Sequence, residues 1–218
     1  MAKKKNISED KIISIYMDYV LEHGENPKSV YAFAKLHHFE ETQFYDYFTG
    51  FEAVEKRIFE AFFTNSIRVL EKNEDYKIFD ARNKLLSFYY TFFENLTANR
   101  SYVLQALNKH NNNLKNLRVL SGLRRHFTEY VHGLGIQMLD LKEKRLERLQ
   151  EKALKESAWA QLLFIIKFWM EDQSSGFEKT DVFIEKSVNT SFDVLNIAPL
   201  QSVLDLGKFL FKEKIHMN

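Results

Sequence analysis

One short segment carries the side chains best suited to hydrogen-bonding with nucleic acid. Gln43, Tyr45 and Tyr47 alternate along it, and their amide and phenolic groups suit base edges or phosphates. Glu40 and Glu41 come just before them and add two carboxylates. Carboxylates near a helix N-terminus gain about 0.3–1 kcal/mol from the helix dipole, but a phosphate would bind at the same place. The segment therefore combines groups that could read DNA with a charge that opposes it.

Basic residues offset the phosphate charge in a DNA complex, so their number and position matter. Lys3, Lys4 and Lys5 form a terminal run that either reaches the minor groove as a basic arm or stays a solvated tail. Residues 1–63 contain eight basic and eleven acidic residues, a net charge of −3, and the whole chain carries +1. The chain has no global basic footprint for nucleic acid.

The sequence lacks the patterns of the common catalytic and metal sites. Cysteine is absent, which excludes disulfides, thiolate metal ligands and thiol nucleophiles. The seven histidines do not have zinc-ligand spacing, and no serine lies in a nucleophile elbow. The cluster Arg124-Arg125-His126 either holds an anionic group at a pocket mouth or forms a solvated helix face. We expect no metal, no cofactor and no enzymatic activity.

Composition indicates the elements that must position these residues. Two prolines and seven glycines in 218 residues favour long helices, and a hydrophobic fraction of 45% is enough for a sizeable core. We therefore expect an all-α fold. The charged N-terminus is not a signal peptide, and the most apolar run, Leu162–Met170, is far below the roughly 20 residues of a membrane span. We expect a cytoplasmic protein without a membrane span.

Apolar residues recur at helical spacing, and capping residues and breaks divide the chain into helices. Ser8 and Ser29 are N-cap candidates, Gly24 is a natural stop, and the residues after Leu36 form a turn. The predicted helices cover Ser8–His23, Ser29–Leu36, Glu40–Phe48, Glu52–Lys72, Ile78–Ala98, Ser101–His110, Leu114–Gly133, Lys144–Asp172, Lys179–Leu195 and Leu200–Lys212.

Tyr45, Tyr47 and Phe48 close the third predicted helix, two short helices flank the turn before them, and a long helix rich in apolar residues follows. This pattern resembles the TetR family of transcriptional regulators, whose recognition helix ends in the same aromatic arrangement. The resemblance implies a three-helix helix-turn-helix domain over residues 1–51. A larger C-terminal helical domain for effector binding and dimerisation would cover residues 52–218.

The resemblance also implies a homodimer that binds duplex DNA and a small apolar ligand. DNA contacts would come from Ser29, Gln43, Tyr45, Tyr47, Lys3, Lys4 and Lys5. The dimer interface would include Trp159, Leu162, Ile166, Trp169, Phe183 and Val188, although a helix this apolar could also be a central core helix. The ligand pocket would be lined by aromatic residues that could equally be ordinary core, namely Phe88, Tyr89, Phe92, Tyr102, Phe127, Tyr130 and Phe168.

Four positions depart from the family pattern. His38 stands where the turn glycine is usual, Glu40 replaces a small N-cap serine, and Glu41 replaces a basic residue or proline. Phe51 stands where a phosphate-binding lysine is usual. Two hypotheses follow. The protein is a one-component regulator that binds operator DNA and senses a small apolar or aromatic effector. Alternatively, it has lost DNA binding and serves as a lipid- or metabolite-binding accessory protein.

Overall fold

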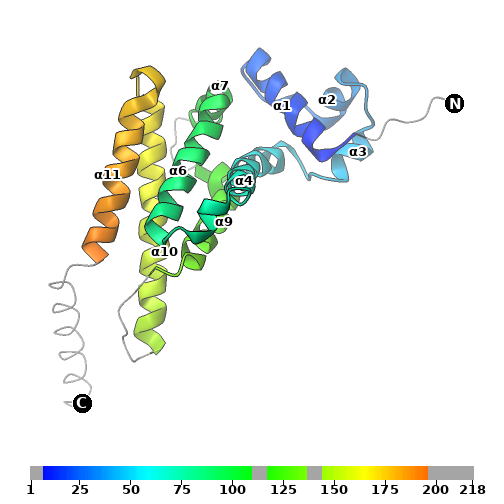
Figure 1. Cartoon of the computed structure of the whole chain (residues 1–218). Coiled ribbons are helices and arrows are strands. Elements are labelled where there is room, and N and C mark those ends of the chain that lie inside the picture. The colour runs from blue at the N-terminus through cyan, green and yellow to red at the C-terminus, as the bar shows by residue number, and fades with distance from the viewer. Residues whose placement is uncertain (1–6, 110–116, 137–143, 196–218) are drawn as a thin grey trace, which may run out of the picture. The chain divides into compact units, whose positions relative to one another are not determined.

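The computed structural model describes residues 7–109, 117–136 and 144–195, and all regular elements in these ranges are helices (Figure 1). The prediction of an all-α fold is confirmed. The chain forms two compact units. The first contains Met1–Lys72 and Thr91–Phe127, and the second contains Asn73–Tyr90 and Thr128–Asn218. These units are groupings by packing, and the functional division predicted at residue 51 stays a prediction.

The first unit begins with the N-terminal module, which consists of three helices. They are α1 (Glu9–His23), α2 (Val30–Leu36) and α3 (Glu41–Tyr45). The sequence predicted all three, but α3 ends before the predicted end at Phe48. The chain still turns after Tyr45, since the Phe48 N–H donates to the Phe44 carbonyl at 2.9 Å. This turn directs the chain into the next helix.

Local hydrogen bonds explain why α1 and α2 begin and end where they do. The Ser8 hydroxyl accepts from the Lys11 N–H at 3.3 Å, and the Ser29 hydroxyl accepts from the Ala32 N–H at 3.1 Å. Gly24 takes a left-handed conformation with φ of 75°, which ends α1 at the predicted residue. Both predicted N-caps are therefore confirmed.

The long helix α4 (Phe51–Leu70) is the core element of the first unit. Val54, Ile58 and Phe59 are almost completely buried along one face. The second half of α6 (Ala81–Ala98), α7 (Arg100–Leu107), η1 (Leu117–Leu120) and the first half of α9 (Ser121–Gly133) complete this unit. At Gly122, near the start of α9, the Glu60 side chain lies where a Cβ would be, so a larger residue there would displace it.

The second unit is built around a helical hairpin. Its elements are α5 (Glu74–Ile78), the first half of α6, the end of α9, α10 (Lys144–Glu171), η2 (Ser175–Phe177) and α11 (Glu178–Leu195). The helices α10 and α11 lie side by side, as Figure 1 shows in yellow and orange. No helix within the described ranges is long and apolar enough to cross a membrane.

The structure corrects two predicted helices. The predicted helix Ile78–Ala98 begins later, as α6 at Ala81, because the Asp80 carboxylate accepts from the Asn83 N–H at 2.8 Å. Ile78 instead ends the short helix α5. The predicted helix Leu114–Gly133 opens with the 3-10 turn η1 before α9, and its first residues lie outside the described ranges. The predicted helix Leu200–Lys212 also lies outside them.

Candidate functional site

An aromatic core holds the helix-turn-helix together. Phe33 from α2 and Phe44 from α3 are buried, and their rings meet edge to face with centroids 6.5 Å apart. Phe51, at the start of α4, lies 5.5 Å from Phe33 and stacks on Tyr16 of α1 at the same distance. Phe51, which departs from the family pattern, therefore has a packing role that a lysine could not fill.

The turn between α2 and α3 has the geometry expected of a glycine, although histidine occupies it. His38 has φ of 59°, in the left-handed region that is unfavourable for residues with a Cβ. The Phe39 N–H donates to the Ala34 carbonyl at 3.0 Å and closes the turn. His38 therefore has the backbone conformation expected of the usual glycine at this turn, although it carries a side chain.

The predicted DNA contacts at the starts of α2 and α3 have local structural roles. A capping box joins Glu40 and Gln43, and the Gln43 Oε1 accepts from the Glu40 N–H at 3.1 Å. The Ser29 hydroxyl caps α2 as described above. Glu40 thus substitutes functionally for the usual small N-cap residue. A DNA contact through Gln43 or Ser29 stays a prediction.

Tyr45 and Tyr47 lie on the surface of the module. Their side chains are 53% and 48% exposed, whereas Phe44 and Phe48, which flank them in the sequence, are buried. The Tyr45 hydroxyl points toward Glu41, at 3.4 Å from its Oε1. The two tyrosines are therefore accessible to a partner, although a carboxylate accompanies one of them. Lys3, Lys4 and Lys5 lie outside the described residues.

Part of the predicted effector pocket lies in the second unit. Phe88 and Tyr89 are fully buried, and the Phe88 ring lies 5.0 Å from that of Tyr130. Burial and a hydrogen bond with Tyr76, 2.9 Å away, raise the pKa of the Tyr130 hydroxyl, so it stays protonated. Phe168 stacks on Phe183 with centroids 4.6 Å apart. These residues form an aromatic core with hydroxyls inside it.

The remaining predicted pocket residues belong to the first unit. Phe92 and Phe127 are fully buried, and Tyr102 is 1% exposed. Tyr102 lines a cavity next to the N-terminal module, and the other predicted pocket residues do not line this cavity. The role of the seven aromatic residues in effector binding stays a prediction.

The predicted dimer residues lie on the α10–α11 hairpin, mostly on its inner side. Leu162, Ile166, Trp169 and Val188 are buried within the subunit, whereas Trp159 and Phe183 are half-buried. Their part in a dimer interface stays a prediction. The predicted interface did not include the large apolar side chains that the hairpin exposes most, which are Phe164 at 67%, Leu149 at 63%, Val182 at 47% and Val194 at 45%.

The turn between α10 and α11 depends on one buried carboxylate that sequence reasoning missed. Asp172 is 7% exposed, and its two oxygens accept from the N–H and hydroxyl of both Ser174 and Thr180 at 2.7–3.0 Å. Burial alone would raise the pKa of this carboxyl, but the four hydrogen bonds outweigh burial and hold it well below its usual value. Asp172 therefore fixes the hairpin as a charged group.

A second buried carboxylate joins three helices of the first unit. Glu55 is 7% exposed, and its Oε1 accepts from the Tyr16 hydroxyl at 2.7 Å and from the Lys109 Nζ at 2.5 Å. The Gln105 Nε2 donates to the Val20 carbonyl at 2.9 Å and ties α7 to α1 as well. The available sequence signal was that Glu55 shares a helical stripe with Ile58 and Phe62, where an apolar residue is expected.

One known family matches this chain. Its model, described as the tetracyclin repressor-like C-terminal domain, covers residues 84–210, which is more than half of the 218 residues. The match includes α7, α9, α10, α11 and most of α6. Among curated proteins, none matches the chain. The match therefore rests on the C-terminal helices, whereas the aromatic pattern in α3 lies in the part that precedes them.

Proposed function

Because this chain belongs to the family with a tetracyclin repressor-like C-terminal domain, the TetR family, we propose that it is a one-component transcriptional regulator. The N-terminal module binds operator DNA, and the protein acts as a homodimer in the cytoplasm, where DNA is accessible. A small apolar or aromatic effector binds the C-terminal helices. In this proposal the functional domains are residues 1–51 and 52–218, and the protein is not an enzyme.

The observation that carries the proposal is the surface of α3. Tyr45, at the end of α3, and Tyr47, in the turn after it, are about half exposed, and Phe44 holds this segment against α2. This arrangement leaves two phenolic side chains accessible at the end of the helix that would enter the major groove. A monomer would read one half-site only, so a homodimer suits a two-fold operator.

The aromatic core supports the effector part of the proposal. Tyr89 and Tyr130 place hydroxyls among the fully buried Phe88 and its neighbours. Ligand sites commonly combine apolar walls with a few polar groups, and an aromatic effector matches such walls. The effector alters DNA binding only if it binds one conformation of the dimer more tightly than another.

The proposal is tested by fluorescence anisotropy with the purified full chain. The probes are a duplex from the region upstream of its own coding sequence and a random duplex of the same length, each at low and moderate salt. We expect the upstream duplex to bind more tightly and the affinity to fall as salt rises, because phosphate contacts release counterions. If a folded dimer binds neither duplex at low salt, the regulator proposal is wrong.

The charge of the N-terminal module favours a second function, that of a TetR-like accessory protein without DNA binding. Glu40 and Glu41 lie at the start of α3, and residues 1–63 carry a net charge of −3. Such a protein would bind a lipid or metabolite through its aromatic core. It predicts that the wild type does not bind DNA, and that Glu40→Lys with Glu41→Lys creates salt-sensitive binding.

The matched control for that double variant is Glu71→Lys with Glu74→Lys, which makes the same change of charge at exposed positions outside the module. If both double variants bind DNA equally, the effect reflects net charge alone. That result would not support the hypothesis that Glu40 and Glu41 on α3 prevent DNA binding.

A further inference from the structure

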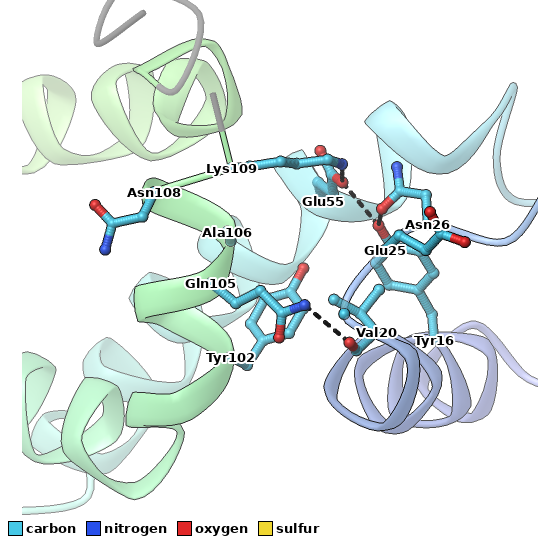
Figure 2. A pocket seen from close by; sticks show the side chains of 11 residues that line it. Tyr16, Val20, Glu25, Asn26, Glu55, Tyr102, Gln105, Ala106, Asn108 and Lys109 are labelled. Atoms are coloured by element: carbon cyan, nitrogen blue, oxygen red, sulfur yellow. Dashed lines mark hydrogen bonds and ion pairs between the residues drawn. The ribbon is translucent and has the colours of Figure 1, made fainter. Parts of the chain in front are cut away.

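A cavity of about 350 Å³ lies in the first unit, between α1, α4 and α7, and we call it the polar cavity (Figure 2). Small-molecule sites usually have volumes of roughly 300–1,000 Å³, so a small organic molecule fits this space. Unlike the aromatic core, it is lined by many polar side chains, including Tyr16, Asn26, Glu55, Tyr102, Gln105 and Lys109.

The electrostatics of the polar cavity favour a cation. Glu25 and Glu55 contribute two carboxylates, and Lys109 contributes the one ammonium group among the described residues that line it. Val20 and Gly24 at the C-terminal end of α1 also line it, and the carbonyl end of a helix carries a partial negative charge. The two carboxylates outnumber the one ammonium group, so the charged groups of the lining favour a cation over an anion.

Tyr102 provides an unused polar group in the wall of the cavity. Its side chain is 1% exposed, and its hydroxyl has no hydrogen-bond partner in the part of the chain that the structure describes. Figure 2 shows this hydroxyl directed toward the space between α7 and α1. Burial and the nearby charge of Glu55 raise the pKa of Tyr102, so the neutral hydroxyl can accept a hydrogen bond from a ligand.

Glu55 also has a carboxylate oxygen that can accept a hydrogen bond from a ligand. The hydrogen bonds from Tyr16 and Lys109 both end on its Oε1. Within the described residues no hydrogen bond reaches its Oε2. A buried carboxylate gains most from charged donors, because the surrounding dielectric is low. The free oxygen of Glu55 and the hydroxyl of Tyr102 are thus two acceptors in the same cavity.

We propose that the polar cavity binds a small organic cation whose ammonium group is hydrogen-bonded to Glu55 and Tyr102. An ammonium group has several donors and no acceptor, which matches a wall that offers a carboxylate oxygen and a hydroxyl. The site is separate from the aromatic effector core and does not depend on DNA binding. The inference therefore goes beyond the proposed function and can hold if that function fails.

The test is isothermal titration calorimetry of the full chain with putrescine, a small organic diamine. Butanediol serves as the neutral analogue and succinate as the anionic one. We expect saturable binding of putrescine at one site per chain and no saturable binding of the other two. Equal binding of butanediol, or no binding of putrescine, would overturn the proposal, because charge would then not determine recognition.

Variants locate the binding site. Tyr102→Phe removes only the hydroxyl, and Glu55→Gln removes the charge, so each should weaken putrescine binding by about tenfold or more. Glu52→Gln is the matched control, since Glu52 lies one turn earlier on α4 and pairs with Lys56 at 3.0 Å outside the cavity. It should bind putrescine as the wild type does.

Glu55→Gln also removes a buried charge that joins three helices, so its fold is checked by circular dichroism. Tyr102→Phe keeps the test decisive if Glu55→Gln does not fold, because a ring without the hydroxyl fills the same space. Wild-type affinity in a folded Tyr102→Phe variant would place the amine elsewhere and overturn the assignment.

Discussion

The Tyr16 hydroxyl donates a 2.7 Å hydrogen bond to the Oε1 of Glu55, which joins α1 to α4 through a carboxylate that is 7% exposed. Lys109 reaches the same oxygen from the end of α7. A buried charge is tolerated only when it is paired and hydrogen-bonded. Burial, and then the charge of Glu55, raise the pKa of Tyr16, so its hydroxyl remains a donor at neutral pH.

Tyr16→Phe tests the energy of this contact. The substitution leaves the buried charge of Glu55 with one hydrogen-bond donor fewer, so we expect the free energy of unfolding to fall by about 1.5–3 kcal/mol. Urea denaturation followed by circular dichroism measures the change. Tyr19→Phe is the control, because Tyr19 lies on the same helix and its ring packs against other rings. Its hydroxyl forms no hydrogen bond with the residues that the structure describes. Equal midpoints for the two variants would contradict the prediction.

His38→Gly should stabilise the protein. The backbone at this position has φ of 59°, and glycine adopts that conformation without the Cβ penalty of about 1 kcal/mol. We expect a higher thermal midpoint in calorimetry. His38→Ala separates the backbone from the side chain, since it removes the imidazole but keeps the Cβ. If alanine stabilises the protein as much as glycine does, backbone strain is not the cause.

Asp172→Asn should destabilise the α10–α11 hairpin at neutral pH. The variant loses the charge that accepts four hydrogen bonds, so we expect a loss of about 2 kcal/mol in the free energy of unfolding. Asp181→Asn is the control on α11. Burial first, and then the neighbouring Asp172 and Glu178, raise the pKa of Asp181, so removing its charge should leave stability unchanged or slightly higher.

The same prediction has a pH dependence with a definite sign. The folded-state pKa of Asp172 lies below the unfolded value of about 3.9. Its contribution to stability is therefore present above that unfolded value and is lost as the pH falls through the folded pKa. In acid titrations of the denaturation midpoint, the curves of wild type and Asp172→Asn should begin to converge as the pH falls below about 4. Parallel curves would contradict this account.

Tyr45→Ala should weaken binding to the upstream duplex without unfolding the module. The side chain is 53% exposed, and substitutions at exposed positions usually change stability by less than about 0.5 kcal/mol. We expect at least about a fivefold loss of affinity by anisotropy, from a hydrogen bond of about 1 kcal/mol or more. Tyr31→Ala, at a 59% exposed position on α2, is the matched control. If both variants lose the same affinity for the duplex, α3 is not part of the DNA interface.

Phe164→Lys should weaken dimerisation while the subunit stays folded. Phe164 is 67% exposed on α10, so in a dimer its ring would be buried against the partner. A lysine there would place a charge in the interface, which costs free energy. Sedimentation equilibrium should show that the Kd of the dimer rises at least about tenfold. Ile78→Lys, at an 82% exposed position on α5, should stay dimeric. Trp169→Ala should instead lower subunit stability by about 3–5 kcal/mol, because Trp169 is fully buried.

Local chemistry explains which elements could be predicted. Ser8, Gly24 and Ser29 set helix ends through bonds to residues within one turn, so their types and positions were sufficient evidence. The start of α6 also has a local cause, the Asp80 carboxylate that accepts from the Asn83 N–H, although the predicted helix began at Ile78. In the aromatic segment Phe44 and Phe48 are buried and Tyr45 and Tyr47 between them are exposed, which helical spacing does not reveal because α3 ends at Tyr45.

The sequence by itself determined the all-α class, the first two helix caps and the family, because helical periodicity and capping depend on neighbours along the chain. Only the tertiary structure decided that Glu55 meets both Tyr16 and Lys109, and that Tyr102 faces a polar cavity rather than apolar neighbours alone. These residues come from α1, α4 and the end of α7. Their charges and hydroxyls stabilise the fold only when packing brings distant helices together in a low dielectric. No pattern within one helix predicts which of these residues come into contact.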